Sequence, residues 1–185
     1  MKIISGQYKG KNIKSLKDNS VRPTTNKIRE AIFNIIEHNE LITIADYRNL
    51  NYLEIFAGSA IMGFEFISRG VENCTLIDKN PELKKLFTHN AQILHDQKTN
   101  FIVSDINKLP QATQQFNLCF IDPPYKLKIE QITLDKLAQH NWLANNALVI
   151  LETDKRNEFI ISKKFQTLFT KIYGKTKILF LNYQS

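Results

Sequence analysis

Along residues 51 to 152, short apolar runs alternate with longer stretches of helical spacing, and this alternation restricts the fold more than any other feature of the sequence. The apolar runs have the length of strands and cover residues 51–56, 73–78, 101–104, 116–121 and 147–152. Helical patterns end near residue 69, span residues 81–95 and span residues 128–141. Such a β-α-β order predicts an α/β fold with a doubly wound, mostly parallel sheet and helices on both faces.

The two ends of the chain depart from this alternation. Residues 165–173 and 175–183 are β-like runs separated by a glycine, so we expect an antiparallel hairpin at the sheet edge. Residues 1–20 alternate loosely and contain two glycines, which predicts a small hairpin or an extended basic arm. A chain of 185 residues without a linker is expected to form one domain over its whole length, with this N-terminal β extension and a body at 21–185.

A further helix is expected between the N-terminal extension and the first strand. Arg22-Pro23-Thr24-Thr25 precedes it, and proline disfavours helix in the residue before it, whereas Thr24 or Thr25 can cap the helix that follows. The apolar residues then recur at the spacing of one buried stripe, at Ile28, Ala31, Ile32, Ile35 and Ile36.

Positive charge gathers at the two ends of the chain. The net charge is +7, from 25 lysine and arginine residues and 18 acidic ones. Residues 1–30 hold eight basic residues against two acids, and residues 155–177 hold seven against one, so the remainder of the chain is mildly acidic. Two basic ends that fold toward one face would attract phosphates, although scattered charges that only aid solubility remain the alternative.

Several protein classes are not supported by the sequence. No apolar run approaches the roughly 20 residues that span a membrane, and the first residues lack a signal peptide, so we expect a cytoplasmic protein without membrane contact. Cys74 and Cys119 lie in apolar strand-like runs and are expected to be small core residues. No histidine and cysteine cluster has the spacing of metal ligands, so no metal is expected. A monomer is the default expectation.

Glycines and acids follow the ends of the predicted parallel strands, where ligands bind in such sheets. The first strand runs into Glu54-Ile55-Phe56-Ala57-Gly58-Ser59-Ala60, whose glycine would let a ligand approach the backbone. Asp78 ends the second strand 20 residues after Gly58, about where nucleotide-binding folds place an acid on the ribose hydroxyls. Asp105 follows the third strand and could accept a hydrogen bond from an adenine amino group. Both acids could equally be helix caps.

The fourth strand ends at Asp122-Pro123-Pro124-Tyr125, the most informative motif in the chain. Two prolines fix a rigid turn and remove two backbone donors, which leaves carbonyls beside one carboxylate and one aromatic ring. A base amino nitrogen is a poor nucleophile, because its lone pair is delocalised into the ring. A carboxylate and a proline carbonyl can accept both of its N–H bonds, and the tyrosine ring can stack on the base. The four residues are therefore candidate catalytic residues for amino-group methylation.

Taken in order, these motifs resemble the bacterial 16S ribosomal RNA guanine-N(2) methyltransferases of the RsmD type over nearly the whole chain. The matching segments are Ile4-Ser5-Gly6-Gln7-Tyr8-Lys9-Gly10-Lys11, Arg22-Pro23-Thr24-Thr25, Arg29-Glu30, Phe33-Asn34, Leu53 to Ser59, Ser68-Arg69-Gly70, Leu76-Ile77-Asp78 and Asp122 to Tyr125. The Asp-Pro-Pro-Tyr element alone is shared with DNA adenine methyltransferases. The Arg-Pro-Thr element in so short a chain is typical of the ribosomal RNA family.

The resemblance implies a Rossmann-like, S-adenosylmethionine-dependent methyltransferase fold with a seven-stranded sheet. It implies that the cofactor is bound by Glu54, Phe56, Ala57, Gly58, Ser59, Asp78, Asp105 and Ile106. It further implies RNA contacts at Lys9, Lys11, Arg22, Thr24 and Arg29, with 16S ribosomal RNA or a small-subunit assembly particle as partner. Ala60 departs from the family pattern, which has glycine there; if the position requires positive φ, alanine costs on the order of 1 kcal/mol.

Three other functions share part of this pattern. A DNA adenine methyltransferase shares the Asp122 motif, but it usually carries a sizeable target-recognition domain, for which little sequence remains here. A non-catalytic RNA-binding assembly factor could keep the fold, although the carboxylate, both prolines and the aromatic ring are all present. A nicotinamide dehydrogenase expects glycine where Ala60 stands.

Overall fold

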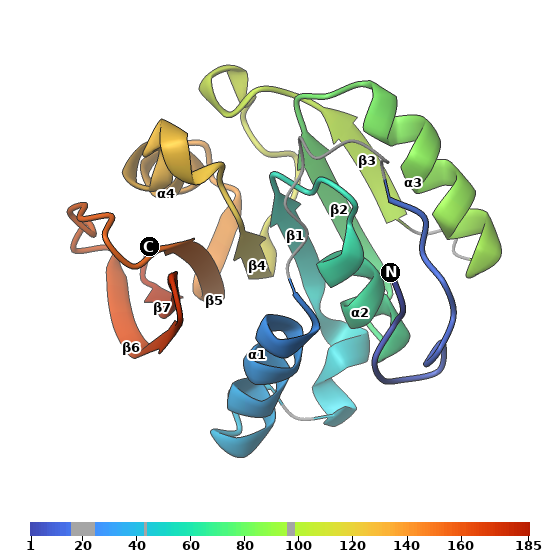
Figure 1. Cartoon of the computed structure of the whole chain (residues 1–185). Coiled ribbons are helices and arrows are strands. Elements are labelled where there is room, and N and C mark those ends of the chain that lie inside the picture. The colour runs from blue at the N-terminus through green and yellow to red at the C-terminus, as the bar shows by residue number, and fades with distance from the viewer. Residues whose placement is uncertain (16–24, 43, 96–98) are drawn as a thin grey trace.

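The structure is a computed structural model that describes residues 1–15, 25–42, 44–95 and 99–185 (Figure 1). Its strands are β1 (Asn51–Ile55), β2 (Asn73–Asp78), β3 (Thr99–Val103), β4 (Phe116–Ile121), β5 (Leu143–Asp154), β6 (Phe165–Tyr173) and β7 (Thr176–Tyr183). Its α-helices are α1 (Asn26–His38), α2 (Ile61–Ser68), α3 (Glu82–Ile93) and α4 (Glu130–Gln139), and its 3₁₀ helices are η1 (Ile44–Asn49), η2 (Ile106–Lys108) and η3 (Tyr125–Leu127).

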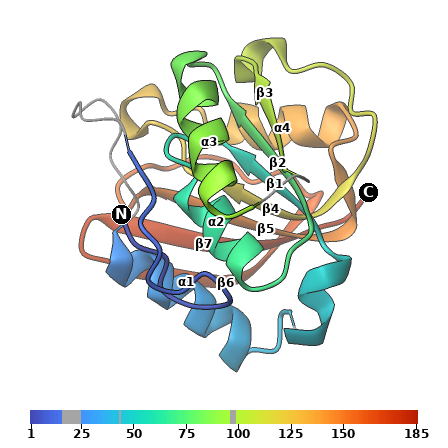
Figure 2. The ribbon, with the colours of Figure 1, turned by 90° about the vertical axis from the view of Figure 1, so that its right-hand side faces the viewer.

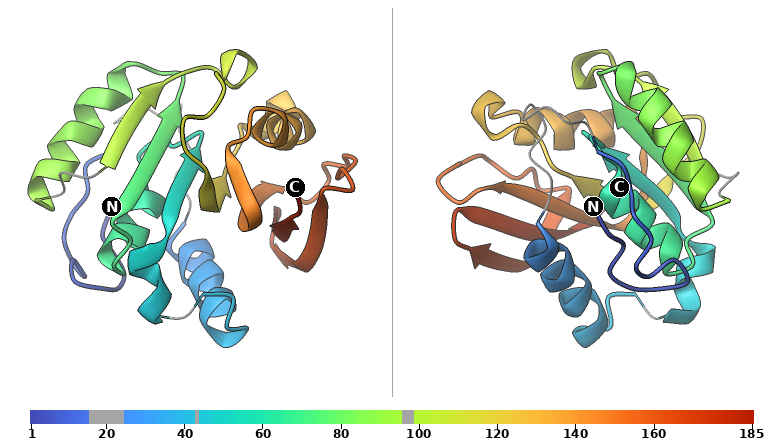
Figure 3. Two further views of the ribbon diagram at one scale, coloured as in Figure 1. Left: turned by 180° about the vertical axis from the view of Figure 1, so that it is seen from behind. Right: turned by 45° about the vertical axis from the view of Figure 1, so that its right-hand side comes forward.

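The strands form one seven-stranded sheet in the order β3-β2-β1-β4-β5-β7-β6. Neighbouring strands from β3 to β5 pair in parallel, whereas β7 is antiparallel to both β5 and β6. The chain moves outward from β1 to β3 and then restarts on the other side of β1 at β4, so the topological switch lies between β1 and β4. The predicted mixed sheet with a C-terminal hairpin is confirmed, and Figure 3 shows β6 and β7 at the edge opposite β3.

Helices cover both faces of the sheet, and each face has its own apolar core. One core joins buried side chains of α1, α2 and α3 to one face, and the other joins α4 and Ile106 of η2 to the opposite face. In Figure 2, α1, α2 and α3 lie in front of the sheet and α4 lies behind it. The two cysteines lie buried and free within these cores, as expected. No helix among the described residues is long and apolar enough to cross a membrane.

Local chemistry explains where the elements begin and end. α1 begins after Thr25, whose hydroxyl accepts a hydrogen bond from the Ile28 N–H at 3.3 Å. β1 ends at Ile55, one residue before the predicted boundary, because Phe56 takes a positive φ of 62°. β5 is longer than predicted at both ends, since Leu143 pairs with Phe116 before an irregularity that leaves extra residues in β5, and Asp154 pairs with Thr176 of β7.

The N-terminal segment forms a small hairpin with only one isolated β-bridge, between Lys2 and Asn12. Its turn packs against the C-terminal end of α2, where a Cβ atom on Gly6 would lie 2.0 Å from the carbonyl oxygen of Ser68. Because α2 runs back from the carboxyl ends of the strands, this contact places the hairpin turn at their amino ends. In Figure 1 the arrowheads of β1 and β3 point to the top and the hairpin turn lies at the bottom.

Candidate active site

The turn after β1 has an unusual backbone. Phe56, Gly58 and Ala60 have φ values of 62°, 52° and 57°, although only glycine adopts this region without cost. The turn is held by three short contacts: Ala57 N–H donates to the Ile77 carbonyl at 3.0 Å, Gly58 N–H donates to Asp78 Oδ2 at 2.9 Å, and Ala60 N–H donates to the Ala57 carbonyl at 2.6 Å. Strained residues fixed in this way cluster at binding sites.

Asp78 joins this turn to the end of β2. Its Oδ2 accepts the Gly58 N–H, and its Oδ1 accepts the Asn80 N–H at 2.9 Å. Each carboxylate oxygen has a second lone pair, so the group can still accept hydrogen bonds from a ligand. Asp78 therefore orders the turn and faces the cavity described next, rather than capping the following helix; α3 begins after Asn80, whose side chain accepts the Glu82 N–H at 3.0 Å.

A cavity of about 270 Å³ lies at the carboxyl ends of β1, β2, β3 and β4. Five of the predicted site residues line it: Phe56, Asp78, Asp105, Ile106 and Pro124. The sequence interpretation missed Lys79, Asn107, Leu127 and Ile129, which also line it. Leu127 and Ile129 closely follow the Asp-Pro-Pro-Tyr motif, and this position after the fourth strand is the signal that could have found them. Ala57, Gly58 and Ser59 build the neighbouring turn.

Asp105 is the N-cap residue of η2 and also lines the cavity. Its Oδ1 accepts hydrogen bonds from the backbone N–H of Asn107 at 2.8 Å and from the Asn107 side-chain amide at 3.0 Å. Within the described part of the chain, Oδ2 accepts no hydrogen bond, so this oxygen remains for a donor in the cavity.

Glu54 is not among the residues that line the cavity, and its expected contact with the cofactor stays a prediction. Its side chain is buried, and Oε2 accepts hydrogen bonds from the Tyr52 hydroxyl at 3.0 Å and the Gly63 N–H at 2.7 Å. Burial raises the pKa of this carboxyl from 4.5 to about 8, more than these two hydrogen bonds lower it. Gly63 approaches Glu54 rather than a ligand, because an added Cβ would lie 2.9 Å from Oε2. Glu54 thus fixes the first turn of α2, the helix that follows the glycine turn, through the Gly63 N–H.

Asp122-Pro123-Pro124-Tyr125 leaves β4 beside the end of β1, and the Asp122 N–H donates to the Ile55 carbonyl at 3.5 Å. The Pro124 carbonyl accepts the Leu127 N–H at 2.9 Å, which starts η3. The Pro123 carbonyl accepts no hydrogen bond from any residue that the structure describes. The motif therefore presents one carboxylate and one available carbonyl next to the glycine turn.

Tyr125 is held by residues that the sequence interpretation missed. Its hydroxyl donates to Glu152 Oε1 at 3.0 Å and lies 3.3 Å from Thr176 Oγ1. Burial and the neighbouring Glu152 carboxylate raise the pKa of the Tyr125 hydroxyl well above its ordinary value of 10.0. The Asn157 amide donates to the Tyr125 carbonyl at 3.4 Å and to the buried Glu130 carboxylate at 2.8 Å. Glu152 ends the otherwise apolar run of residues 147–152, and this is the signal that could have marked it.

The predicted RNA contacts do not gather at this site. Arg29 is fully buried and corrects the expectation of a surface role: its guanidinium donates to Glu65 Oε1 at 2.6 Å and to the Lys2 carbonyl at 3.0 Å. Lys11 donates to the Ile93 carbonyl at the end of α3, at 3.2 Å, so it lies at the amino ends of the strands. Lys9 is exposed in the same hairpin. The predicted contacts Arg22 and Thr24 lie outside the described residues.

Four features define the class of protein. They are the order of the strands, the switch point beside the strained glycine turn, the acid after β2 and the Asp-Pro-Pro-Tyr turn after β4. The protein has the Rossmann-like fold of S-adenosylmethionine-dependent methyltransferases. Among the described residues, no group of three or more His, Cys, Asp or Glu side chains is arranged to hold a metal ion.

Comparison with known proteins narrows this class to a family. The model of the family described as Conserved hypothetical protein 95 matches residues 1–182. An uncharacterized methylase of Rickettsia prowazekii is 31% identical over 100% of this chain and 98% of its own length. The ribosomal RNA small subunit methyltransferase D of Buchnera aphidicola subsp. Baizongia pistaciae is 30% identical, over 90% of this chain and 87% of its own.

A solved structure agrees with the sequence matches. The Escherichia coli protein yhhF superimposes with a TM-score of 0.85 at 25% identity, over 100% of this chain and 98% of that one. The chain belongs to the RsmD family of ribosomal RNA small subunit methyltransferases.

Proposed function

We propose that this chain transfers a methyl group from S-adenosylmethionine to the exocyclic N2 amino group of a guanine in small-subunit ribosomal RNA. The observation that carries the proposal is the Asp122 turn, which offers a carboxylate and the available Pro123 carbonyl beside the cavity at the switch point. These two acceptors match the two N–H bonds of an amino group. Family membership directs the proposal to ribosomal RNA.

The cavity supports binding of the cofactor. Asp78 would accept the ribose hydroxyls, and Asp105 Oδ2 would accept the adenine amino group, with Phe56 and Ile106 as apolar walls. The volume of about 270 Å³ lies near the lower end of small-molecule sites, which are roughly 300–1,000 Å³. The cofactor supplies a methyl group that its positive sulfur makes electrophilic. The strained turn from Phe56 to Ala60 would lie beside the methionine part.

The chemistry assigned to the protein is alignment and charge stabilisation. Asp122 and the Pro123 carbonyl would accept hydrogen bonds from the two amino N–H groups, orient the nitrogen lone pair toward the methyl group and favour a pyramidal nitrogen. As the nitrogen bonds to the methyl carbon, the sulfur would keep the electron pair of the broken methyl–sulfur bond, and the Asp122 carboxylate would stabilise the positive charge on nitrogen until one amino proton is lost to solvent. The half-buried ring of Tyr125, fixed by Glu152 and Thr176, would stack on the extruded base.

A methyl-transfer assay with three substrates tests the proposal. Purified protein and labelled S-adenosylmethionine are incubated with small-subunit particles from cells that lack this chain, with naked 16S ribosomal RNA and with unmethylated DNA. Nuclease digestion and mass spectrometry then identify the modified base. We expect N2-methylguanosine in ribosomal RNA, from the particle or the naked RNA. Methyladenine in the DNA, or no transfer to either RNA substrate while the cofactor binds, would contradict the proposal.

A further inference from the structure

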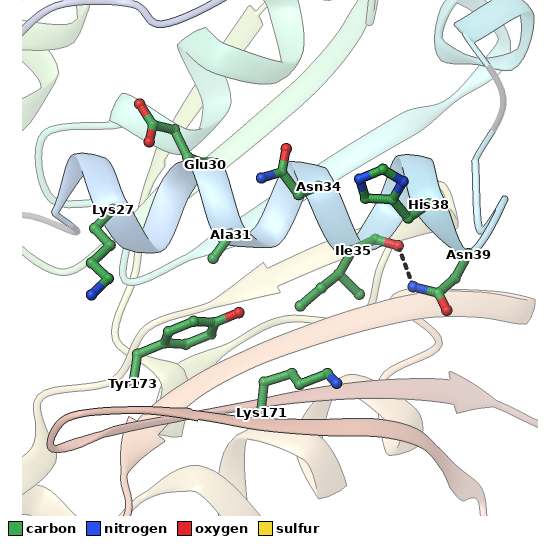
Figure 4. A pocket seen from close by; sticks show the side chains of 9 residues that line it. All are labelled: Lys27, Glu30, Ala31, Asn34, Ile35, His38, Asn39, Lys171 and Tyr173. Atoms are coloured by element: carbon green, nitrogen blue, oxygen red, sulfur yellow. Dashed lines mark hydrogen bonds between the residues drawn. The ribbon is translucent and has the colours of Figure 1, made fainter.

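A groove of about 490 Å³ runs between α1 and the edge strand β6, apart from the cavity described above. Lys27 and Ile35 of α1 face Lys171 and Tyr173 of β6 across it (Figure 4). Ala31 and Ile35 form the apolar part of the α1 wall, and the Tyr173 ring is partly exposed in the groove. The groove thus combines an aromatic ring and an apolar wall with two ammonium groups.

The charges of the groove favour a polyanion. Lys27 and Lys171 are exposed, and in the part of the chain that the structure describes neither forms an ion pair. One carboxylate, that of Glu30, also lines the groove, but in Figure 4 its side chain points away from Lys171 and Tyr173. Lysines spaced along a groove that carries an aromatic ring are typical of single-stranded nucleic acid binding.

One end of the groove lies next to the candidate active site. Tyr173 pairs with Thr176 across the β6–β7 turn, and Thr176 Oγ1 lies 3.3 Å from the Tyr125 hydroxyl. Exposed lysines gather at this end as well, because the Lys155 N–H donates to the Lys175 carbonyl at 2.8 Å. A chain leaving the Tyr125 site would therefore meet the basic turn first and then the groove.

We infer that the groove between α1 and β6 binds the RNA strand that flanks the target nucleotide. Phosphates of the strand contact Lys27 and Lys171, and a base stacks on Tyr173. The inference rests on the proposed function. It also moves the RNA surface away from the N-terminal hairpin, which lies at the amino ends of the strands, to Lys27 of α1 and to the basic residues 155–177.

The test compares two double variants. Lys27→Gln with Lys171→Gln removes the proposed phosphate contacts, and Lys84→Gln with Lys85→Gln removes two exposed lysines of α3 as a matched control. Affinity for small-subunit particles from cells lacking this chain is measured over a salt series, together with KM, kcat and affinity for S-adenosylmethionine. The groove variant should lower the salt slope by about 1.4, which is about 10-fold in affinity at 0.15 M salt, and raise KM. Its kcat and cofactor affinity should match those of the control.

A third comparison isolates the aromatic contact. Tyr173→Leu should weaken particle binding several-fold, and Tyr173→Phe should restore it, because a phenyl ring keeps the stacking surface. Wild-type salt slopes in the lysine variant would overturn the inference while leaving the methyl-transfer function in place. Weaker binding with an unchanged slope would also overturn it and would assign the groove to a ribosomal protein. Wild-type protein that binds the particle without methylating it would contradict the proposed function instead.

Discussion

Ala60 shows how one residue carries strain at the site. It is the N-cap residue of α2 and lies in the left-handed region, at φ 57° and ψ 26°, where its methyl group conflicts with the backbone. Ala60→Gly should therefore raise the free energy of unfolding by about 1 kcal/mol, which is an increase in Tm of about 2–4 °C for a chain of this size. Ala31→Gly, in the middle of α1, is the control and should lower Tm instead. Equal losses in both variants would contradict the assigned backbone strain.

Glu54 makes stability depend on pH through its position in the core. The pKa of this carboxyl is raised to about 8 in the folded protein, so the folded state keeps a proton that the unfolded chain releases near 4.5. The free energy of unfolding contributed by this group should then fall as pH rises from about 4.5 to 8 and level off above that range. Glu54→Gln cannot titrate, so its stability relative to wild type should improve over the same range. Parallel denaturation curves for the two proteins at pH 5, 6.5 and 8 would refute the shift.

At the scale of elements, a buried ion-pair network joins the N-terminal hairpin to two helices. Glu65 of α2 accepts hydrogen bonds from Arg29 of α1, from Arg69 and from the Ile4 N–H at 2.7 Å. The Tyr8 N–H also donates to Ser68 Oγ at 3.0 Å. The hairpin therefore holds the C-terminal end of α2 in place, and the other end of α2 follows the glycine turn of the cavity.

Removing Arg29 should weaken this network. Arg29→Met should lower the free energy of unfolding by about 3 kcal/mol, because it leaves a buried carboxylate and the Lys2 carbonyl short of donors. Arg156→Met removes an exposed partner of Asp154 and should change stability little. Urea denaturation of both variants measures the difference. If Arg29→Met lowers the free energy of unfolding no more than Arg156→Met does, the buried network contributes little to stability.

The sequence predicted the elements better than it predicted the partners of charged residues. The bounds of β2, β4 and β6 agree with the predicted runs, since each apolar run ends at a turn residue. Arg29 was assigned to RNA because a motif does not reveal that Glu65, 36 residues away, is its partner. The spacing of Arg29 to Ile32, Phe33 and Ile36 does place it on the buried side of α1. This spacing indicates a buried partner rather than a contact with RNA.

At the scale of the whole molecule, the N-terminal hairpin lies apart from the basic β6–β7 turn, whereas Lys27, which also belongs to residues 1–30, lies in the groove with Lys171. The N-terminal hairpin lies at the amino ends of the strands, and the β6–β7 turn lies at the carboxyl ends beside Tyr125. Lys9 and Lys11 therefore do not share a face with the basic β6–β7 turn, and their contact with RNA stays a prediction. Linear charge counts could not resolve this, because the path of the strands decides which edge each end reaches.

The most direct test of the account maps methylated guanines in cells. Ribosomal RNA is taken from cells that lack this chain and from the same cells carrying wild type or Asp122→Asn, and N2-methylguanosine is located by mass spectrometry. We predict one small-subunit site that is methylated with wild type and unmethylated both without the chain and with Asp122→Asn, even though the purified variant still binds S-adenosylmethionine. Full methylation with Asp122→Asn, or an unchanged methylation map in cells lacking the chain, would contradict the account.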